Sequence, residues 1–302
     1  MSSSFKDTLT AGAYIAGWRV AGRLPDAAVA RLFNYGADRV SGNGTGMDML
    51  RRNLTRVVGV ENVDQKLVRA SVRSYARYWK EAFRLPRLAG DANVVAQITR
   101  SLSGREHLDK ALEQGRGVIL ALPHSGNWDM AGMWLVRNYG RFTTVAERLA
   151  PDSLFRAFVE FREGLGFEVL PHSGGEEPPY ARLREVLEAG GIVCLLGERD
   201  LTPKGVPVEF FGEATTMPAG PAKLAVETGA ALLPAHAWFE GTDRQPAWGL
   251  KAEQPLEVTT VGQTTQRLAD RFASNIAAHP ADWHMLQPMW PVDRPKKPRR
   301  GR

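Results

Sequence analysis

A histidine and an aspartate five positions apart give this 302-residue chain its clearest chemical signal. His124 and Asp129 belong to the run Leu122-Pro123-His124-Ser125-Gly126-Asn127-Trp128-Asp129. Residues 117–121 before it are apolar and bounded by Gly and Pro, which is typical of a buried parallel strand. A histidine at the carboxyl end of such a strand, near a carboxylate, suits general-base catalysis. The alternative is a packed, hydrogen-bonded histidine without a chemical role.

A second apolar run also ends in polar residues. Residues 192–196 predict another buried strand, and Glu198 and Asp200 follow it. We expect only one of these two carboxylates to face a given partner. If this strand lies beside residues 118–122, one carboxylate can reach His124 and orient it.

The chain lacks the G-x-S-x-G pattern of a serine nucleophile. This absence favours direct attack by a substrate hydroxyl, with the protein supplying only the base. We expect backbone N–H groups of the turn after His124 to stabilise the oxyanion of such a reaction.

Several cations are expected near the same edge of the sheet. The cation Arg148 follows Glu147 at the end of the predicted strand 142–146. Two further cations are Arg162 on the next helix and Lys204 after Glu198. Such cations suit the phosphates of a substrate. The alternative is that Arg148 and Arg162 pair at the surface with Glu147 and Glu163.

Strands and helices alternate from about residue 115, which predicts an α/β fold with a mostly parallel central sheet flanked by helices. The expected strands are 118–122, 142–146, 167–170, 192–196 and 230–237, and the expected helices between them are 130–138, 153–165, 179–188 and 218–228. Residues 1–110 look helical, with amphipathic helices at 47–58 and 64–85, the latter ended by Pro86. We therefore divide the chain into a helical, membrane-docking region (1–110), an α/β core (111–290) and a basic tail (291–302).

The charge of the chain favours an anionic partner. The formal net charge is +6, ten Lys or Arg against three Asp or Glu lie in residues 51–87, and six basic residues lie in the last nine. Zinc spacings, aromatic RNA-binding signatures and helix-turn-helix motifs are not found, so nucleic acid is not favoured. An anionic membrane surface or a phosphorylated substrate fits as well. The alternative for the tail is a solvated, disordered end.

The sequence shows neither a spanning segment nor a signal peptide. Residues 9–24 carry Tyr14 and Trp18 beside arginines, as an interfacial helix does, although a core helix is the alternative. Cys194, the single cysteine, lies in an apolar run and is expected to be a buried small side chain in a reducing compartment. Phe210 and Phe211 either wall an apolar slot or pack in the core.

Taken together, these runs resemble the glycerolipid and lipid A acyltransferase superfamily, whose hallmark is His, four residues, then Asp or Glu. The Asn-Trp before Asp129 resembles the lipid A late-acyltransferase branch. So do the following runs: Arg52-Asn53-Leu54, Phe210-Phe211-Gly212, Ala214-Thr215 and the spaced Gly220-Pro221-Ala222, Leu224-Ala225, Gly229-Ala230 and Pro234. The resemblance covers roughly residues 45–290.

Two features depart from the lipid A enzymes: Asp129 replaces their usual Glu, and their N-terminal spanning helix is missing. Both features, with residues 74–86, resemble the phosphatidylinositol mannoside acyltransferases. That resemblance implies transfer of a fatty acyl group, typically palmitoyl, from acyl-CoA to a mannose hydroxyl at the cytoplasmic face of the plasma membrane. It implies no cofactor beyond acyl-CoA as co-substrate and no metal, and its partners are acyl-CoA, the mannosylated lipid and an anionic membrane surface.

The resemblance also implies roles for individual residues. His124 becomes the general base, Glu198 orients it, and Asp129 supports the histidine or the turn. The expected substrate-binding residues are Glu147 and Arg148 for the acceptor, Arg162 and Lys204 for the CoA phosphates, and Asp200, Glu227 and His284. Three other activities stay open: acylation of another glycolipid or a lysophospholipid, thioester hydrolysis, and carriage of lipid without turnover.

Overall fold

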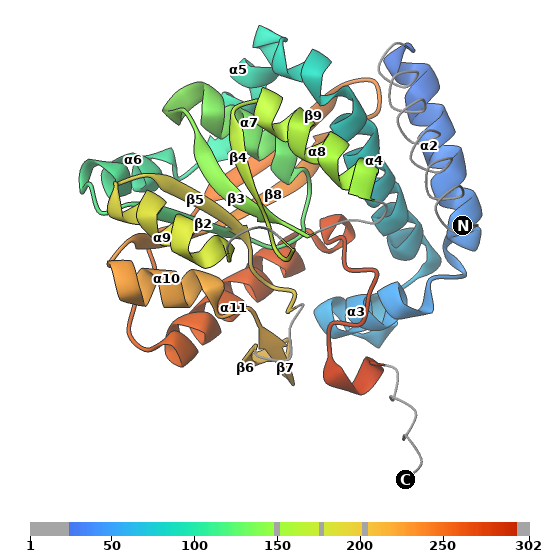
Figure 1. Ribbon diagram of the computed structural model, residues 1–302. Helices are drawn as coiled ribbons and strands as arrows, with labels where there is room; N and C mark the ends of the chain where they lie inside the picture. Colours follow the sequence, from blue (N-terminus) through green and yellow to red (C-terminus); the bar gives the residue numbers. More distant parts are fainter. Residues whose placement is uncertain (1–23, 148–151, 175–177, 201–204, 295–302) are drawn as a thin grey trace, which may run out of the picture.

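The computed structural model describes residues 24–147, 152–174, 178–200 and 205–294 (Figure 1). It has the expected α/β architecture, with a seven-stranded sheet in the order β1-β9-β8-β2-β5-β3-β4 and a separate β6–β7 hairpin. The strands are β1 (Leu102–Ser103), β2 (Val118–Leu122), β3 (Phe142–Ala146), β4 (Phe167–Pro171), β5 (Ile192–Leu196), β6 (Val206–Phe210), β7 (Glu213–Met217), β8 (Ala231–Gly241) and β9 (Pro246–Ala252).

The sheet is mostly parallel. Strand β2 pairs in parallel with β5 and β8, and β3 pairs in parallel with β4 and β5. Only β8 and β9 pair in the antiparallel direction within this sheet, and β1 follows β9 in parallel. The carboxyl ends of β2, β5 and β3 therefore meet at one edge.

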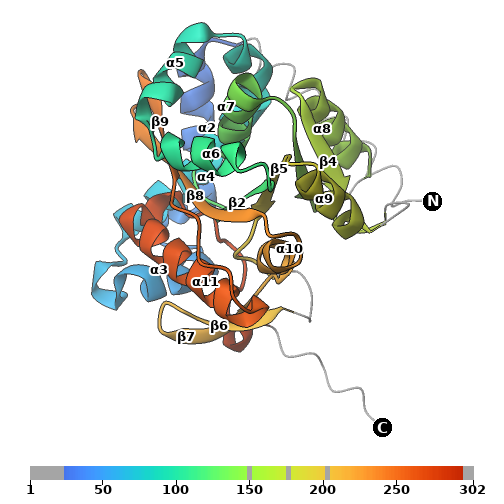
Figure 2. The ribbon, with the colours of Figure 1, turned by 90° about the vertical axis from the view of Figure 1, so that its left-hand side faces the viewer.

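Helices cover both faces of the sheet, as Figure 2 shows with α5, α6 and α7 above it and α10 and α11 below it. The helices are α2 (Asp26–Val40), α3 (Asp48–Val58), α4 (Gln65–Ala89), α5 (Ala92–Ser101), α6 (Arg105–Glu113), α7 (Trp128–Tyr139), α8 (Asp152–Gly164), α9 (Pro179–Glu188), α10 (Gly220–Thr228) and α11 (Val261–Ala278). Short 3-10 turns occupy Gly42–Gly44, Val60–Asn62, Pro280–Asp282 and Pro291–Asp293. In the parts of the chain just named, no helix is both long enough and apolar enough to cross a bilayer.

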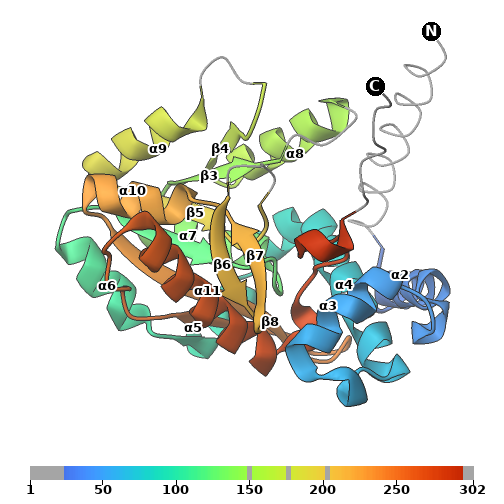
Figure 3. The ribbon, with the colours of Figure 1, turned by 90° about the horizontal axis from the view of Figure 1, so that it is seen from below.

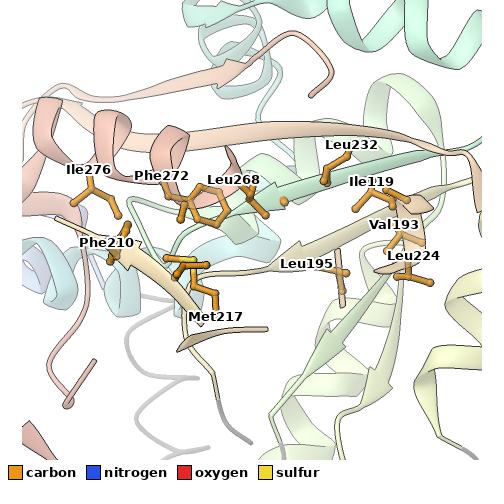
Figure 4. Packing of buried hydrophobic residues seen from close by; sticks show 14 of the residues in the cluster. Ile119, Val193, Leu195, Phe210, Met217, Leu224, Leu232, Leu268, Phe272 and Ile276 are labelled. Carbon is orange, nitrogen blue, oxygen red and sulfur yellow. The ribbon is translucent and has the colours of Figure 1, made fainter. Parts of the chain in front are cut away.

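Two apolar cores follow from the alternation of side chains along the strands. Ile119 and Val193 face α9, α10 and α11 and are fully buried with Phe272 (Figure 4). Val118 and Leu120 face the opposite side and pack with residues of α4 to α7. The β6–β7 hairpin lies on the side of α11 (Figure 3) and closes the first core.

The five predicted strands and four predicted helices of the α/β core are all present, with ends shifted by a few residues. The prediction that Pro86 ends its helix is wrong, because α4 continues to Ala89. A proline removes only its own N–H donor, and buried Leu85 and Ala89 hold the last turn against the core. Strand β9 and the β6–β7 hairpin were not predicted.

The first 110 residues contribute to the sheet and to its core. Strand β1 pairs with β9, and Leu85, Ile98 and Leu108 share a cluster with Val118. The division at residue 110 stays a prediction. The predicted interfacial helix at residues 9–24 falls almost wholly outside the described residues, as does most of the tail.

Candidate active site

The two polar strand ends meet, as the sequence predicts. Strands β2 and β5 pair along their length, with Leu122 opposite Leu196, and the Gly197 N–H donates to the Leu122 carbonyl at 2.9 Å. His124 and Glu198 each follow two residues later. The register of two neighbouring parallel strands therefore brings the imidazole and the carboxylate together.

Glu198 and His124 form a hydrogen-bonded pair. Glu198 Oε1 lies 2.8 Å from His124 Nδ1 and accepts the His124 backbone N–H at 2.7 Å. The Glu198 side chain is fully buried, whereas that of His124 is 27% exposed. Burial raises the pKa of the Glu198 carboxyl, but the charge of His124 and its two hydrogen bonds outweigh burial and lower that pKa. Glu198 is therefore held as a carboxylate.

The charge on Glu198 sets the tautomer of His124. A carboxylate only accepts hydrogen bonds, so the Nδ1 atom beside it carries the proton. When the imidazole is neutral, Nε2 is therefore the unprotonated nitrogen, and no described residue is its partner. Because the ring lines the cavity described below, this nitrogen is available to take a proton from a bound hydroxyl.

A segment far along the chain holds the turn that carries His124. We call residues 282–284 the strap. The carbonyl of Asp282 accepts the Gly126 N–H at 2.9 Å, and the His284 N–H donates to the His124 carbonyl at 2.7 Å. The indole Nε1 of Trp283 lies 3.4 Å from Glu198 Oε1. One short segment thus touches both members of the pair.

The turn after His124 is tightly constrained. Gly126 has a φ of +60°, and a β-carbon there would lie 2.5 Å from the carbonyl carbon of Ala237. The N–H groups of His124, Ser125 and Gly126 donate to Glu198, Pro123 and Asp282 respectively. The prediction that N–H groups here stabilise an oxyanion is therefore wrong for these three donors, because other oxygens already accept from them.

Asp129 does not contact His124. Its carboxylate accepts two hydrogen bonds from Arg162, at 2.8 and 3.1 Å, and one from the Tyr78 hydroxyl at 3.0 Å. Burial, followed by the charge of Asp129, raises the pKa of Tyr78 well above 10. The alternative of a surface pair between Arg162 and Glu163 is wrong, because Arg162 pairs with Asp129. A largely buried Arg162, held by both carboxylate oxygens, supports a structural pair more than a phosphate site.

A cavity of about 380 Å³ lies under α7. The partly exposed residues of its lining, among them His124 and Arg199, mark its mouth, and buried Leu108 and Leu120 line its interior. It passes across the sheet from Cys194 on β5 to Leu250 on β9, and Leu102 and Leu108 lie at the far side. Its wall is mainly apolar, and burial raises the pKa of the Cys194 thiol. Phe210 and Phe211 are not among the residues that line this cavity; Phe210 stacks on Trp290 in the other core, so the packing alternative is right.

Polar residues surround the mouth of the cavity. Glu147, which follows β3 as predicted, lies 3.4 Å from Arg199, and Arg199 also bonds Gln287. All three line the cavity. The sequence did not single out Arg199, because it lies between Glu198 and Asp200 and only these carboxylates were candidates for the partner of His124. Arg148 and Lys204 lie outside the described residues.

The remaining predicted site residues lie in different places relative to His124 and the cavity. Asp200 turns away from His124 and accepts from the Thr216 hydroxyl at 2.9 Å. Alternation along an extended chain would place residues 198 and 200 on the same side, but the strand ends at Leu196 and the chain bends at Glu198. Glu227 bonds the Tyr180 hydroxyl at the carboxyl end of α10, beside the amino-terminal end of β8, and is absent from the cavity lining. The sheet therefore separates Glu227 from His124. His284, in contrast, lines the cavity.

A buried glutamate that the sequence did not single out supports the same turn. Glu81 on α4 accepts from Asn127 Nδ2 and from Trp248 Nε1, each at 2.7 Å, and from Arg77 at 2.7 Å. Asn127 in turn caps α7 through the Met130 N–H. Arg77 and Glu81 stand four residues apart on one helix, which is the only local signal for this network.

Comparisons with known proteins match most of this chain to acyltransferases. A family model described as bacterial lipid A biosynthesis acyltransferase matches residues 2–291. The phosphatidylinositol mannoside acyltransferase of Mycobacterium tuberculosis (strain ATCC 25618 / H37Rv) is 56% identical over 295 residues, which cover 96% of this chain and 92% of that protein. The protein of the same name from Mycolicibacterium smegmatis is 57% identical over 288 residues, 93% of this chain and 91% of that protein.

The lowered pKa of Glu198 predicts a pH-dependent contribution to stability. A carboxyl whose folded pKa lies below its unfolded value, about 4.3 for Glu, stabilises the fold above that pH and loses this effect as the pH falls through the folded pKa. We expect Glu198→Gln to lower the free energy of unfolding by about 1–3 kcal/mol at pH 7, and by progressively less as the pH falls below about 4.3, measured by urea unfolding over a series of pH values.

The matched control is Glu106→Gln, since the Glu106 side chain is 74% exposed on α6. Its effect is expected to be small throughout the series. A loss of stability for Glu198→Gln that stays constant as the pH falls below about 4.3 would contradict a charged, hydrogen-bonded Glu198.

Proposed function

This chain belongs to the bacterial lipid A biosynthesis acyltransferase family, and we propose that it transfers a fatty acyl group, palmitoyl, from acyl-CoA to a mannose hydroxyl of a phosphatidylinositol mannoside. The observation that carries this proposal is the His124–Glu198 pair at the mouth of an apolar cavity. The names of the two relatives support the acceptor, and the cavity supports the acyl donor.

His124 acts as the general base in the proposed reaction. Its Nε2 takes the proton of the sugar hydroxyl while that oxygen attacks the thioester carbonyl. The carbon–sulfur bond then breaks, and the thiolate of coenzyme A leaves and takes the proton back from His124. Glu198 stabilises the imidazolium that exists between these two transfers. A base positioned in this way typically contributes about 10²–10⁴-fold to the rate.

The acyl chain occupies the cavity under α7. Each buried methylene contributes roughly 0.8 kcal/mol to binding, so a long chain is held firmly by an apolar wall. The thioester then lies at the mouth, beside His124. There Arg199 is within reach of the phosphates of coenzyme A or of the acceptor, whereas Arg162 supports Asp129. The proposed phosphate contact of Lys204 and acceptor contact of Arg148 rest on the sequence.

The test is to incubate the protein with palmitoyl-CoA and a panel of acceptors, and to identify products by mass. We expect acylated phosphatidylinositol mannoside, and at least a 100-fold loss in His124→Ala because the base is removed. His107→Ala, a change on α6 away from the cavity mouth, is the control and retains transfer. Transfer within tenfold of wild type in a folded His124→Ala variant would contradict the assignment.

The same assay distinguishes the alternative functions and tests the acyl site. Preferred acylation of another glycolipid or of a lysophospholipid, or release of free palmitate without an acceptor, would replace the proposed activity. Leu108 is 2% exposed at the far side of the cavity, so Leu108→Trp is expected to favour shorter acyl donors while Leu108→Met does not. An unchanged donor preference in Leu108→Trp would place the acyl chain elsewhere.

We also propose that the protein binds the cytoplasmic face of the plasma membrane as a peripheral protein, through α2. Leu32, Tyr35 and Val40 are 63%, 63% and 70% exposed on this helix, and Arg31 and Arg39 are exposed beside them. Apolar and basic side chains on one helix surface suit an anionic lipid interface. The basic helices from residue 51 to 87 contribute less than the sequence suggests, since Arg69 and Arg73 both pair with Asp38.

The double variant Leu32→Ser, Tyr35→Ser is therefore expected to lose most binding to vesicles that contain phosphatidylinositol, measured by co-sedimentation. Added salt should weaken the binding of the wild type, because it screens the arginines. Val226→Ser is the control, since Val226 is exposed on α10, on the side of the molecule away from α2 (Figure 1). Equal binding by the double variant and the wild type would exclude α2 as the docking surface.

A further inference from the structure

His284 has one ring nitrogen that nothing in the described chain satisfies. The side chain lines the cavity, and the residue is only 7% exposed. Its Nε2 lies 2.9 Å from the hydroxyl of Ser74 on α4. Its Nδ1 is buried and has no hydrogen-bond partner among the described residues. A buried polar atom without a partner is costly, so this nitrogen calls for a ligand.

A chain of hydrogen bonds fixes which nitrogen of His284 carries the proton. The Ser74 hydroxyl donates to Asp282 Oδ1 at 2.6 Å, and the Phe239 N–H donates to Asp282 Oδ2 at 2.9 Å. Burial raises the pKa of Asp282, whereas the hydrogen bonds from Ser74 and Phe239 favour its carboxylate form, which can only accept. Since the single proton of Ser74 goes to Asp282, the Ser74 oxygen accepts from His284 Nε2. Nδ1 is then unprotonated and can only accept.

The ring is also held in the neutral form. Burial, followed by the charge of His124, lowers the pKa of His284 to about 3. Tyr75, Tyr78 and Trp128 surround the ring with centroid distances of 5.3 to 6.0 Å. Trp128 also contacts the ring of His124 at 5.6 Å, so both histidines share one wall of the cavity. The unprotonated Nδ1 of His284, beside the base His124, can accept a hydrogen bond from a ligand hydroxyl. It cannot donate one to an oxyanion.

We propose that His284 Nδ1 accepts a hydrogen bond from a hydroxyl of the acceptor sugar and so positions that sugar against His124. This inference rests on the proposed function for the identity of the sugar. His284 is a binding and positioning residue: it takes no proton in the reaction. The Asp282–Ser74 pair serves it by keeping the proton on Nε2.

Two substitutions separate the two nitrogens of His284. An asparagine places its amide near the position of Nδ1 and can supply an acceptor there, whereas a glutamine reaches toward Ser74 and leaves the Nδ1 position empty. We expect His284→Gln to raise the acceptor KM roughly three- to tenfold, with the palmitoyl-CoA KM changed less than twofold. His284→Asn is expected to restore most of the acceptor KM. Ser74→Ala removes the partner that keeps the proton on Nε2 but leaves the Nδ1 atom in place, so it is expected to have a smaller effect than His284→Gln.

A second measurement does not depend on turnover. Calorimetry with phosphatidylinositol mannoside is carried out on His124→Ala and on His124→Ala combined with His284→Gln, with mannoside analogues that each lack one hydroxyl. The single variant should discriminate against one analogue by several-fold, and the double variant should not. Binding without acyl transfer in the wild type would overturn the proposed function and leave this inference standing.

Other outcomes overturn the inference itself. A rise in the palmitoyl-CoA KM alone would place Nδ1 against the donor, and a fall in kcat with both KM values unchanged would make His284 an oxyanion donor. Equal loss in His284→Gln and His284→Asn, or equal discrimination among analogues with and without His284, would reduce the residue to a packing role.

Discussion

The buried carboxylate of Glu198 is the interaction on which the arrangement of the site depends. A charged group without access to water depends on its hydrogen-bond partners. Glu198 Oε1 has the backbone N–H and the imidazole of His124 as partners, whereas Oε2 is buried without a partner among the described residues. This requirement fixes the position, the tautomer and the orientation of the histidine at once. Removing the imidazole would leave a buried carboxylate with only the backbone N–H as its partner. Removing Glu198 would leave Nδ1 of His124 without its acceptor.

The elements around the pair hold His124 in the position that the Glu198 carboxylate requires. The parallel register of β2 and β5 places the two residues side by side, and the 282–284 strap completes the hydrogen bonds of the turn. Glu81 and the Asp129–Arg162 pair fix the start of α7 from the opposite side. The cavity extends from this rigid edge into the core, so a flexible chain in it ends beside a histidine that cannot move far.

The sequence predicted what local patterns encode. Apolar runs bounded by glycine located β2 and β5. The different directions of Glu198 and Asp200 do not follow from strand alternation, which would place them on one side; they arise because the chain bends at Glu198 after β5 ends. Contacts between distant segments were not readable: Ser74 and Asp282 are 208 positions apart, and Arg162 meets Asp129 rather than a neighbour. The position of Glu227 was unreadable for the same reason, because its distance from His124 depends on the direction of α10 against the sheet. His284 carried no local pattern beyond Trp283 and Met285.

The central claim is that Glu198 holds His124 with the proton on Nδ1 and a basic Nε2 toward the cavity. Nitrogen-15 NMR of the imidazole groups in the full chain tests it most directly, with His124→Gln to assign the signals. The account predicts that neutral His124 is protonated at Nδ1 alone in the wild type, and that Glu198→Gln allows both tautomers. A neutral His124 protonated at Nε2 in the wild type would contradict it.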